Sequence, residues 1–277
     1  MPEMETGLDI YGENFDCVCG FCCVDGDQSL EWCQTKAEIA RHTEEVSRLL
    51  IGGQDQTRKI QCHDIVTLVV GPDHTKLKCH KVLLGFKSEY FDGACYGNFS
   101  TSETNEIRLE EENPTAIAVL ISWLYTGHIS QSCSIAPEEL WVLGDRFLCS
   151  DFSNAVIRHL FSHCTRNHVA IKTVQYAYEN TVSGSKLRAF IKDMILVEGP
   201  LNGALADEDD EEAWRDLIRC GGDLVIDIAL EGSFNSYENV DKRPYYWKNQ
   251  PKYLQPIVSR PIEDFLKGKP RDRKRKA

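Results

Sequence analysis

One short stretch of the chain combines three residue types that could do chemistry. His80 and Lys81 stand side by side in LKCHKVLLGFKSEYFDG, residues 77–93, and Asp64 precedes the apolar run before it. An imidazole beside an ammonium can form a catalytic dyad or bind a ligand, but catalysis also needs a nucleophile at matching spacing, which the stretch lacks. The sequence therefore favours a structural joint. His80 would hydrogen-bond the backbone there, and Lys81 would pair with Asp64 or lay its stem along apolar surface.

The cysteines near the N-terminus are a second group with potential chemistry. Cys17, Cys19, Cys22 and Cys33 lie in or after CVCGFCC, and Cys19 and Cys22 have the spacing of a zinc knuckle. A structural zinc ion needs four ligands on a tetrahedron, and a second pair at the usual distance is missing. Cys33 and His42 would complete the set only at an unconvincing spacing. The sequence thus predicts no cofactor, with zinc at this cluster as the less favoured alternative.

Residues 267–276 form a third, strongly basic group. Seven basic residues face one acidic residue between Lys267 and Lys276, a net charge of +6. The densest part is Arg271, Arg273, Lys274, Arg275 and Lys276. Such a run indicates a nuclear-import signal, a weak nucleic-acid patch or a solvated end. The chain as a whole carries a net charge of −12, which disfavours nucleic acid as a partner.

Length and composition indicate an ordinary globular protein. The 277 residues suffice for one large domain or two small ones. No stretch approaches the roughly 20 apolar residues that span a bilayer, and the acidic N-terminus lacks the apolar core of a secretory signal. We therefore expect the cytoplasm or the nucleus, no membrane contact, and mostly free thiols among the 12 cysteines.

The elements that must position these residues begin with a helix over 36–50, which places Ile39, Val46, Leu49 and Leu50 on one side. A strand over 65–70 and an alternating strand through residue 79 follow, with a turn at 71–73 between them. Ser88 is placed to cap a short helix. A short strand over 107–109 comes next, and then a helix that begins at Pro114 and ends at Gly127.

The second half of the chain is predicted to be helical and then extended. Helices are expected from Pro137, from Asp151, within 168–180 and within 184–199. The acidic run 204–219 suggests one further short helix, and residues 241–261, rich in proline and aromatic residues, fit an extended or disordered segment. This order predicts an α+β fold, a small mixed sheet packed against a cluster of helices.

Residues 64 to about 127 resemble a BTB/POZ domain, most closely the fungal type. The resemblance rests on five motifs in order, DIVTLVV, CHKVLL, SEYF, IRL and the helix end LYTG. It implies the BTB/POZ fold over 62–165 with extra C-terminal helices over 166–200. Outside it we expect a flexible cysteine-containing arm (1–35), a helix and linker (36–61), and a largely disordered segment with the basic tail (201–277).

The resemblance also implies a non-catalytic role in protein–protein interaction, as an oligomerising scaffold or adaptor. Such domains form homodimers or hetero-oligomers, and in several families an extra N-terminal helix extends the dimer face. In some members an Asp and a Lys at the positions of Asp64 and Lys81 frame a charged pocket at the dimer groove. The alternatives are a substrate adaptor of a cullin-type ubiquitin ligase and a zinc-binding protein.

The cullin alternative depends on one loop. The family's adaptors often carry an apolar residue, any residue and then Glu before the short strand. Here the motif falls on Phe99 and Thr101, with Glu103 two residues later. Because the carboxylate is missing at Thr101, a charge-assisted hydrogen bond worth roughly 1.5 to 3 kcal/mol would be lost. The sequence therefore weakens the prediction of a cullin partner without excluding it.

Overall fold

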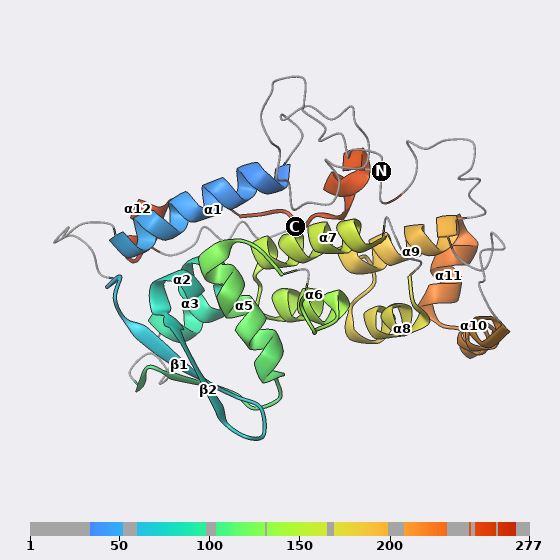
Figure 1. Ribbon diagram of the computed structural model, residues 1–277, viewed down its shortest axis with the longest axis horizontal. Helices are drawn as coiled ribbons and strands as arrows, with labels where there is room; N and C mark the ends of the chain where they lie inside the picture. The colour runs from blue at the N-terminus through green and yellow to red at the C-terminus, as the bar shows by residue number, and fades with distance from the viewer. Residues whose placement is uncertain are drawn as a thin grey trace, which may run out of the picture.

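The computed structural model describes residues 34–51, 60–97, 104–130, 132–164, 169–198, 208–231, 244, 247–258 and 260–269. A small sheet lies at one end of the molecule and helices α8 to α11 lie at the other (Figure 1). Among these residues no helix is both long and apolar enough to cross a bilayer.

The sheet has three strands, β1 (Ile65–Val70), β2 (Thr75–His80) and β3 (Glu106–Leu109). β1 is central, antiparallel to β2 and parallel to β3. Its run of β-branched and apolar residues suits a strand covered on both faces. On β2, Cys79 is buried and Lys76 and Lys78 are exposed, which confirms the alternation seen in the sequence.

Local signals set the helices around the sheet. Ser88 caps the helix that follows it, because its Oγ accepts a hydrogen bond from Phe91 N–H at 3.1 Å. Pro114 begins a helix, and Gly127 ends it in the left-handed conformation at φ 69°. These signals confirm the predicted bounds. The helices of this part are α1 (Gln34–Ile51), α2 (Lys81–Lys87), α3 (Glu89–Tyr96), α5 (Pro114–Thr126), α6 (Pro137–Arg146) and α7 (Ser150–Cys164).

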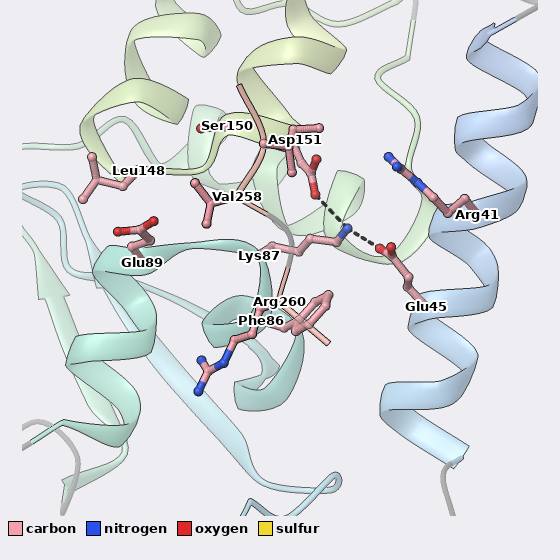
Figure 2. A pocket seen from close by; sticks show the side chains of 11 residues that line it. Arg41, Glu45, Phe86, Lys87, Glu89, Leu148, Ser150, Asp151, Val258 and Arg260 are labelled. Atoms are coloured by element: carbon pink, nitrogen blue, oxygen red, sulfur yellow. Dashed lines mark hydrogen bonds and ion pairs between the residues drawn. The ribbon is translucent and has the colours of Figure 1, made fainter. Parts of the chain in front are cut away.

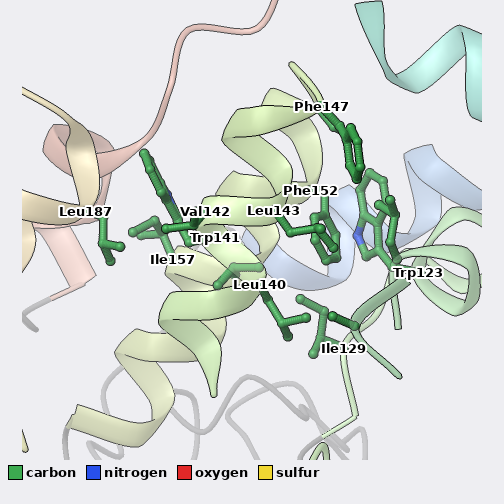
Figure 3. Close-up of a cluster of buried hydrophobic side chains, with 14 of the residues drawn as sticks. Trp123, Ile129, Leu140, Trp141, Val142, Leu143, Phe147, Phe152, Ile157 and Leu187 are labelled. Atoms are coloured by element: carbon green, nitrogen blue, oxygen red, sulfur yellow. The ribbon is translucent and has the colours of Figure 1, made fainter. Parts of the chain in front are cut away.

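The main core lies where α5, α6 and α7 meet. Trp123, Trp141 and Phe152 are buried there, and the rings of Trp123 and Phe152 are 5.2 Å apart (Figure 3). The same core continues under the sheet through Leu68 and Ile107. The predicted α+β architecture, a small mixed sheet against a helical cluster, is confirmed.

Four helices continue the core beyond α7. They are α8 (Ile171–Asn180), α9 (Lys186–Glu198), α10 (Glu208–Cys220) and α11 (Asp223–Glu231). Arg188 on α9 is buried and donates to Asp223 Oδ2 at 2.7 Å and to the Tyr178 carbonyl at 2.6 Å. One guanidinium therefore ties the end of α8 and the start of α11 to α9. The predicted extra C-terminal helices are confirmed.

The prediction that residues 201–277 are largely disordered is wrong for the stretches that the structure describes. Besides α10 and α11, these include the 3₁₀ helix η5 (Trp247–Tyr253) and α12 (Ile262–Leu266). We call residues 247–258 and 260–269 the C-terminal strap; it passes along α7 and reaches α1 (Figure 1). Tyr253 and Phe265 are buried, so aromatic residues of this predicted disordered range contribute apolar contacts to the folded chain.

Helix α1 packs on its own domain. Leu49 is buried in a second apolar cluster, to which α2 and α12 also contribute. His42, on the same helix, is buried beside α5, with its ring 5.0 Å from that of Trp123. The predicted helix over 36–50 is confirmed, with two residues added at its N-terminal end and one at its C-terminal end.

Candidate interaction site

The joint at His80 connects the end of β2 to the end of α5. Tyr125 Oη lies 3.0 Å from His80 N and 2.7 Å from His80 Nδ1. The phenol oxygen accepts from the backbone N–H and forms a second hydrogen bond with Nδ1, in which the imidazole tautomer decides the donor. The predicted backbone partner of the imidazole is thus replaced by a side chain, and CHKVLL and LYTG, separate in the sequence, meet in space.

Lys81 is buried and bonds within its own chain. Its ammonium donates to Asn105 Oδ1 at 2.8 Å and lies 5.5 Å from the centre of the Tyr96 ring. Its contact with Asp64 runs through the main chain, since Lys81 N–H donates to the Asp64 carbonyl at 2.8 Å. Asn105 has a positive φ of 52°, so the ammonium binds a turn just before β3. The amide of Asn105 therefore takes the place that the sequence assigned to the Asp64 carboxylate.

Replacing Lys81 by methionine is expected to lower the free energy of unfolding by about 1.5 to 3 kcal/mol, because the charge-assisted bond to Asn105 is lost. Self-association should be unchanged, since that bond is intramolecular. Urea unfolding and light scattering on the same samples measure the two effects. Lys78→Met on the exposed face of β2 is the control. Unchanged stability with weaker self-association would place Lys81 in a dimer groove instead.

The two thiols nearest the joint are poor nucleophiles. Burial raises the pKa of Cys79 to about 12, and it does the same to Cys95. Both side chains therefore stay protonated near neutral pH, and the thiol is far less reactive than the thiolate. They act as small apolar groups of the core, as their sequence context predicted.

Lys87 carries a charge network that the sequence did not indicate. Its ammonium, with a side chain only 4% exposed, contacts Glu45 Oε2 at 2.5 Å and Asp151 Oδ2 at 3.0 Å (Figure 2). Burial alone would lower the pKa of Lys87, but the two carboxylates together raise it above its ordinary value. The network joins α1, α2 and α7. No local pattern could have predicted it, because the partners are 42 and 64 residues away.

A cleft opens beside this network. Its polar lining includes Lys87, Glu89 and Arg260, and its apolar lining includes Phe86, Leu148 and Val258 (Figure 2). Val258 and Arg260 belong to the C-terminal strap, so the strap forms one wall of the cleft. Leu148 is 55% exposed and has a positive φ of 50°. The mixture of both charges with small apolar contacts suits a protein surface better than a small-molecule pocket.

The C-terminal strap is fastened by polar bonds along its length. Asn154 and Gln255 exchange two hydrogen bonds, of 2.9 and 2.6 Å. Tyr253 Oη donates to Asp193 Oδ2 at 2.6 Å, and burial of the phenol is the main reason its pKa is raised. The strap therefore touches α7 and α9 before it reaches α1. No pattern within 241–261 predicts these partners, because Asn154 and Asp193 are distant from that segment in the sequence.

Several predicted site residues lie outside the described residues. They are the cullin-loop residues Phe99, Thr101 and Glu103, the cysteines Cys17, Cys19, Cys22 and Cys33, and the basic residues Arg271, Arg273, Lys274, Arg275 and Lys276. His42, considered with the cysteines, bonds the Leu124 carbonyl through Nε2 at 3.0 Å. Within the described ranges no cluster of His, Cys, Asp or Glu could hold a metal ion.

Comparison with known proteins places a family model on the part of the chain that carries the joint. Residues 54–164 match the model of the BTB/POZ domain, against the predicted range of 62–165. Kelch-like protein 28 of Homo sapiens is 29% identical over 91 residues, 33% of this chain and 16% of that protein. Kelch-like protein 11 of Homo sapiens is 26% identical over 147 residues, which cover 46% of this chain and 21% of that protein.

Kelch-like protein 30 of Mus musculus is also similar, 30% identical over 81 residues, which are 29% of this chain and 14% of that protein. The matches thus span between 14% and 21% of the length of these relatives. These relatives are mammalian, so the fungal-type qualifier stays a prediction.

Proposed function

We propose that this chain, which contains a BTB/POZ domain, is an oligomerising scaffold or adaptor that joins proteins without catalysing a reaction. The match of residues 54–164 to a family of protein-interaction modules carries the proposal. The outer strands β2 and β3 support it, because the edges of a small sheet can accept a further strand. The buried, protonated thiols beside the joint also fit a non-catalytic role.

Light scattering across micromolar concentrations tests self-association. We expect a dimer or larger assembly whose fraction grows with concentration, as mass action requires. Co-purification from the native cell tests hetero-association at the same time. A strictly monomeric chain that recovers no protein partner would contradict the proposal.

A cullin-type ubiquitin-ligase scaffold is a second candidate partner. The similarity to three Kelch-like proteins favours this candidate over other adaptor roles. The loop residue Thr101 argues against tight binding, because the family's adaptors often have Glu at that position. This candidate therefore predicts weak binding by the natural chain.

Replacing Thr101 by Glu is expected to strengthen cullin binding about ten- to a hundredfold, through one charge-assisted hydrogen bond. A pull-down with purified cullin measures the gain. Thr104→Glu is the matched control, since it adds the same charge close to Thr101 but off the motif position. If the natural chain recovers no cullin while Thr101→Glu does, the adaptor role is removed for the natural chain.

The cytoplasm and the nucleus both suit this function. The basic residues Arg271 to Lys276 support import into the nucleus, and the overall charge of −12 disfavours a nucleic-acid partner. Asp64, His80 and Lys81 are proposed to support the interaction fold from within, since the contacts of His80 and Lys81 described above stay inside the chain.

A further inference from the structure

Helix α12 packs in the second apolar cluster, which adjoins the main core at Tyr96 and Tyr125. Ile262, Phe265 and Leu266 fall at positions i, i+3 and i+4, and their exposed fractions are 6%, 0% and 2%. They pack on side chains from three helices, which we call the α12 seat: Leu49 of α1, Val82, Leu83 and Phe86 of α2, and Tyr96 of α3. Figure 1 shows α12 beside α1, at the opposite end of the molecule from α10 and α11.

Aromatic contacts fix the depth at which α12 lies. The Phe265 ring is 5.4 Å from the Phe86 ring and 5.7 Å from the Tyr96 ring. Ile60 N–H donates to the Leu266 carbonyl at 3.2 Å and so binds the last turn. One phenylalanine with two flanking aliphatic side chains is the anchor pattern of a short helix bound on an apolar face.

Charges at both edges add a sequence requirement. Arg260 donates to Asp92 Oδ2 at 2.8 Å, and the two side chains are only 8% and 19% exposed. Glu263 forms an ion pair with Arg48 of α1. The residues of RPIEDFL that contact the seat thus have the pattern Arg-x-φ-Glu-x-φ-φ, where φ is apolar.

Several features indicate that α12 can leave its seat while the rest of the chain stays folded. The helix has five residues, too few to persist without its seat. Residues 254–258, which lead toward it, have no regular structure. The anchors of α12 belong to the second cluster, whereas the strap residue Tyr253 belongs to the main core. Opening at α12 therefore costs less than global unfolding, as expected for a peripheral unit.

We propose that the α12 seat is a docking site for a short helix of a partner protein with the pattern Arg-x-φ-Glu-x-φ-φ, and that α12 is its intramolecular occupant. The proposal rests on the interaction function proposed above and names one of its surfaces. A partner helix must displace α12, so the strap sets the concentration at which that partner binds. The apolar anchors and charged residues of α12 indicate the side chains that a partner helix would need.

The test uses the full chain and a fluorescein-labelled synthetic peptide of residues 256–269. Phe265→Ala with Leu266→Ala weakens the intramolecular occupant, and we expect this variant to bind the peptide about tenfold or more tightly than the natural chain does. A peptide carrying Phe265→Ala should bind neither chain. Equal affinity of both chains for the natural peptide, with the variant folded by circular dichroism, would overturn the proposal.

An exposed charge pair provides a second test that leaves the core intact, in case the double variant does not fold. A chain with Arg48→Glu should prefer a peptide with Glu263→Arg over the natural peptide, and the natural chain should show the reverse order. The same order for both chains would count against the seat. A double variant that self-associates more tightly than the natural chain and does not bind the peptide would identify a second copy as the occupant and also overturn the proposal.

Failure of the α12 seat can be told apart from failure of the proposed function. Failure of peptide binding leaves self-association and partner recovery by the natural chain untouched. Peptide binding by a chain that is otherwise monomeric and recovers no partner would instead count against the scaffold.

Discussion

Replacing Lys87 by methionine is expected to lower the free energy of unfolding by about 3 to 5 kcal/mol, the usual effect of removing one partner of a buried ion pair. The ammonium lies between Glu45 and Asp151, whose side chains are 23% and 20% exposed. Without it, two nearby carboxylates lose their shared cation and repel each other. Urea unfolding of the variant and the natural chain measures the difference.

A surface pair is the matched control for this change. Lys252 contacts Asp193 at 2.6 Å, but its side chain is 58% exposed. Lys252→Met should therefore cost no more than about 1 kcal/mol. Equal effects of the two substitutions would show that burial does not strengthen the Lys87 network.

The Lys87 effect should also depend on pH. The folded-state pKa of Lys87 is raised above its unfolded value of about 10.4. Its stabilisation is therefore fully present below pH about 10.4 and is lost as the pH rises through the folded pKa. The stability gap between the natural chain and Lys87→Met should narrow at alkaline pH. A constant gap would mean that packing of the lysine stem, not its charge, causes the loss.

The sequence was most informative where structure is set by neighbours along the chain. Ser88 caps α3, and the alternation of Lys76, Lys78 and Cys79 fixes which face of β2 is buried. Each of these features depends on a few consecutive residues, and so it can be predicted from spacing. The motifs of the BTB/POZ resemblance fall within the same part of the chain.

Contacts between distant segments could not be predicted in this way. Lys87 resembles any surface lysine in FKSEYFDG, and only the fold brings Glu45 and Asp151 to it. Tyr253 and Phe265 stand among prolines and charges without a period, the composition of a disordered peptide. Their burial depends on surfaces made by α1, α2, α7 and α9, and no property of the C-terminal strap encodes those surfaces.

Gly127 combines a feature that the local sequence predicts, the end of a helix, with a contact to a distant segment that only the fold creates. The sequence predicted it as the residue that ends a helix, and its φ of 69° confirms that role. The structure adds that α1 lies directly over it. A Cβ at Gly127 would meet His42 Cγ at 2.9 Å and His42 Cβ at 3.0 Å. A residue without a side chain is therefore required at position 127, both for the left-handed backbone conformation and for the packing of α1.

Replacing Gly127 by alanine should consequently cost more than backbone strain alone. The left-handed conformation costs an alanine about 1 to 2 kcal/mol, and overpacking against His42 adds about 1 to 3 kcal/mol. Gly184→Ala separates the two costs, because Gly184 has φ 79° and its Cβ would meet nothing within 4 Å. Thermal and urea unfolding of both variants give the comparison. Equal effects of the two alanines would show that α1 is not held at Gly127.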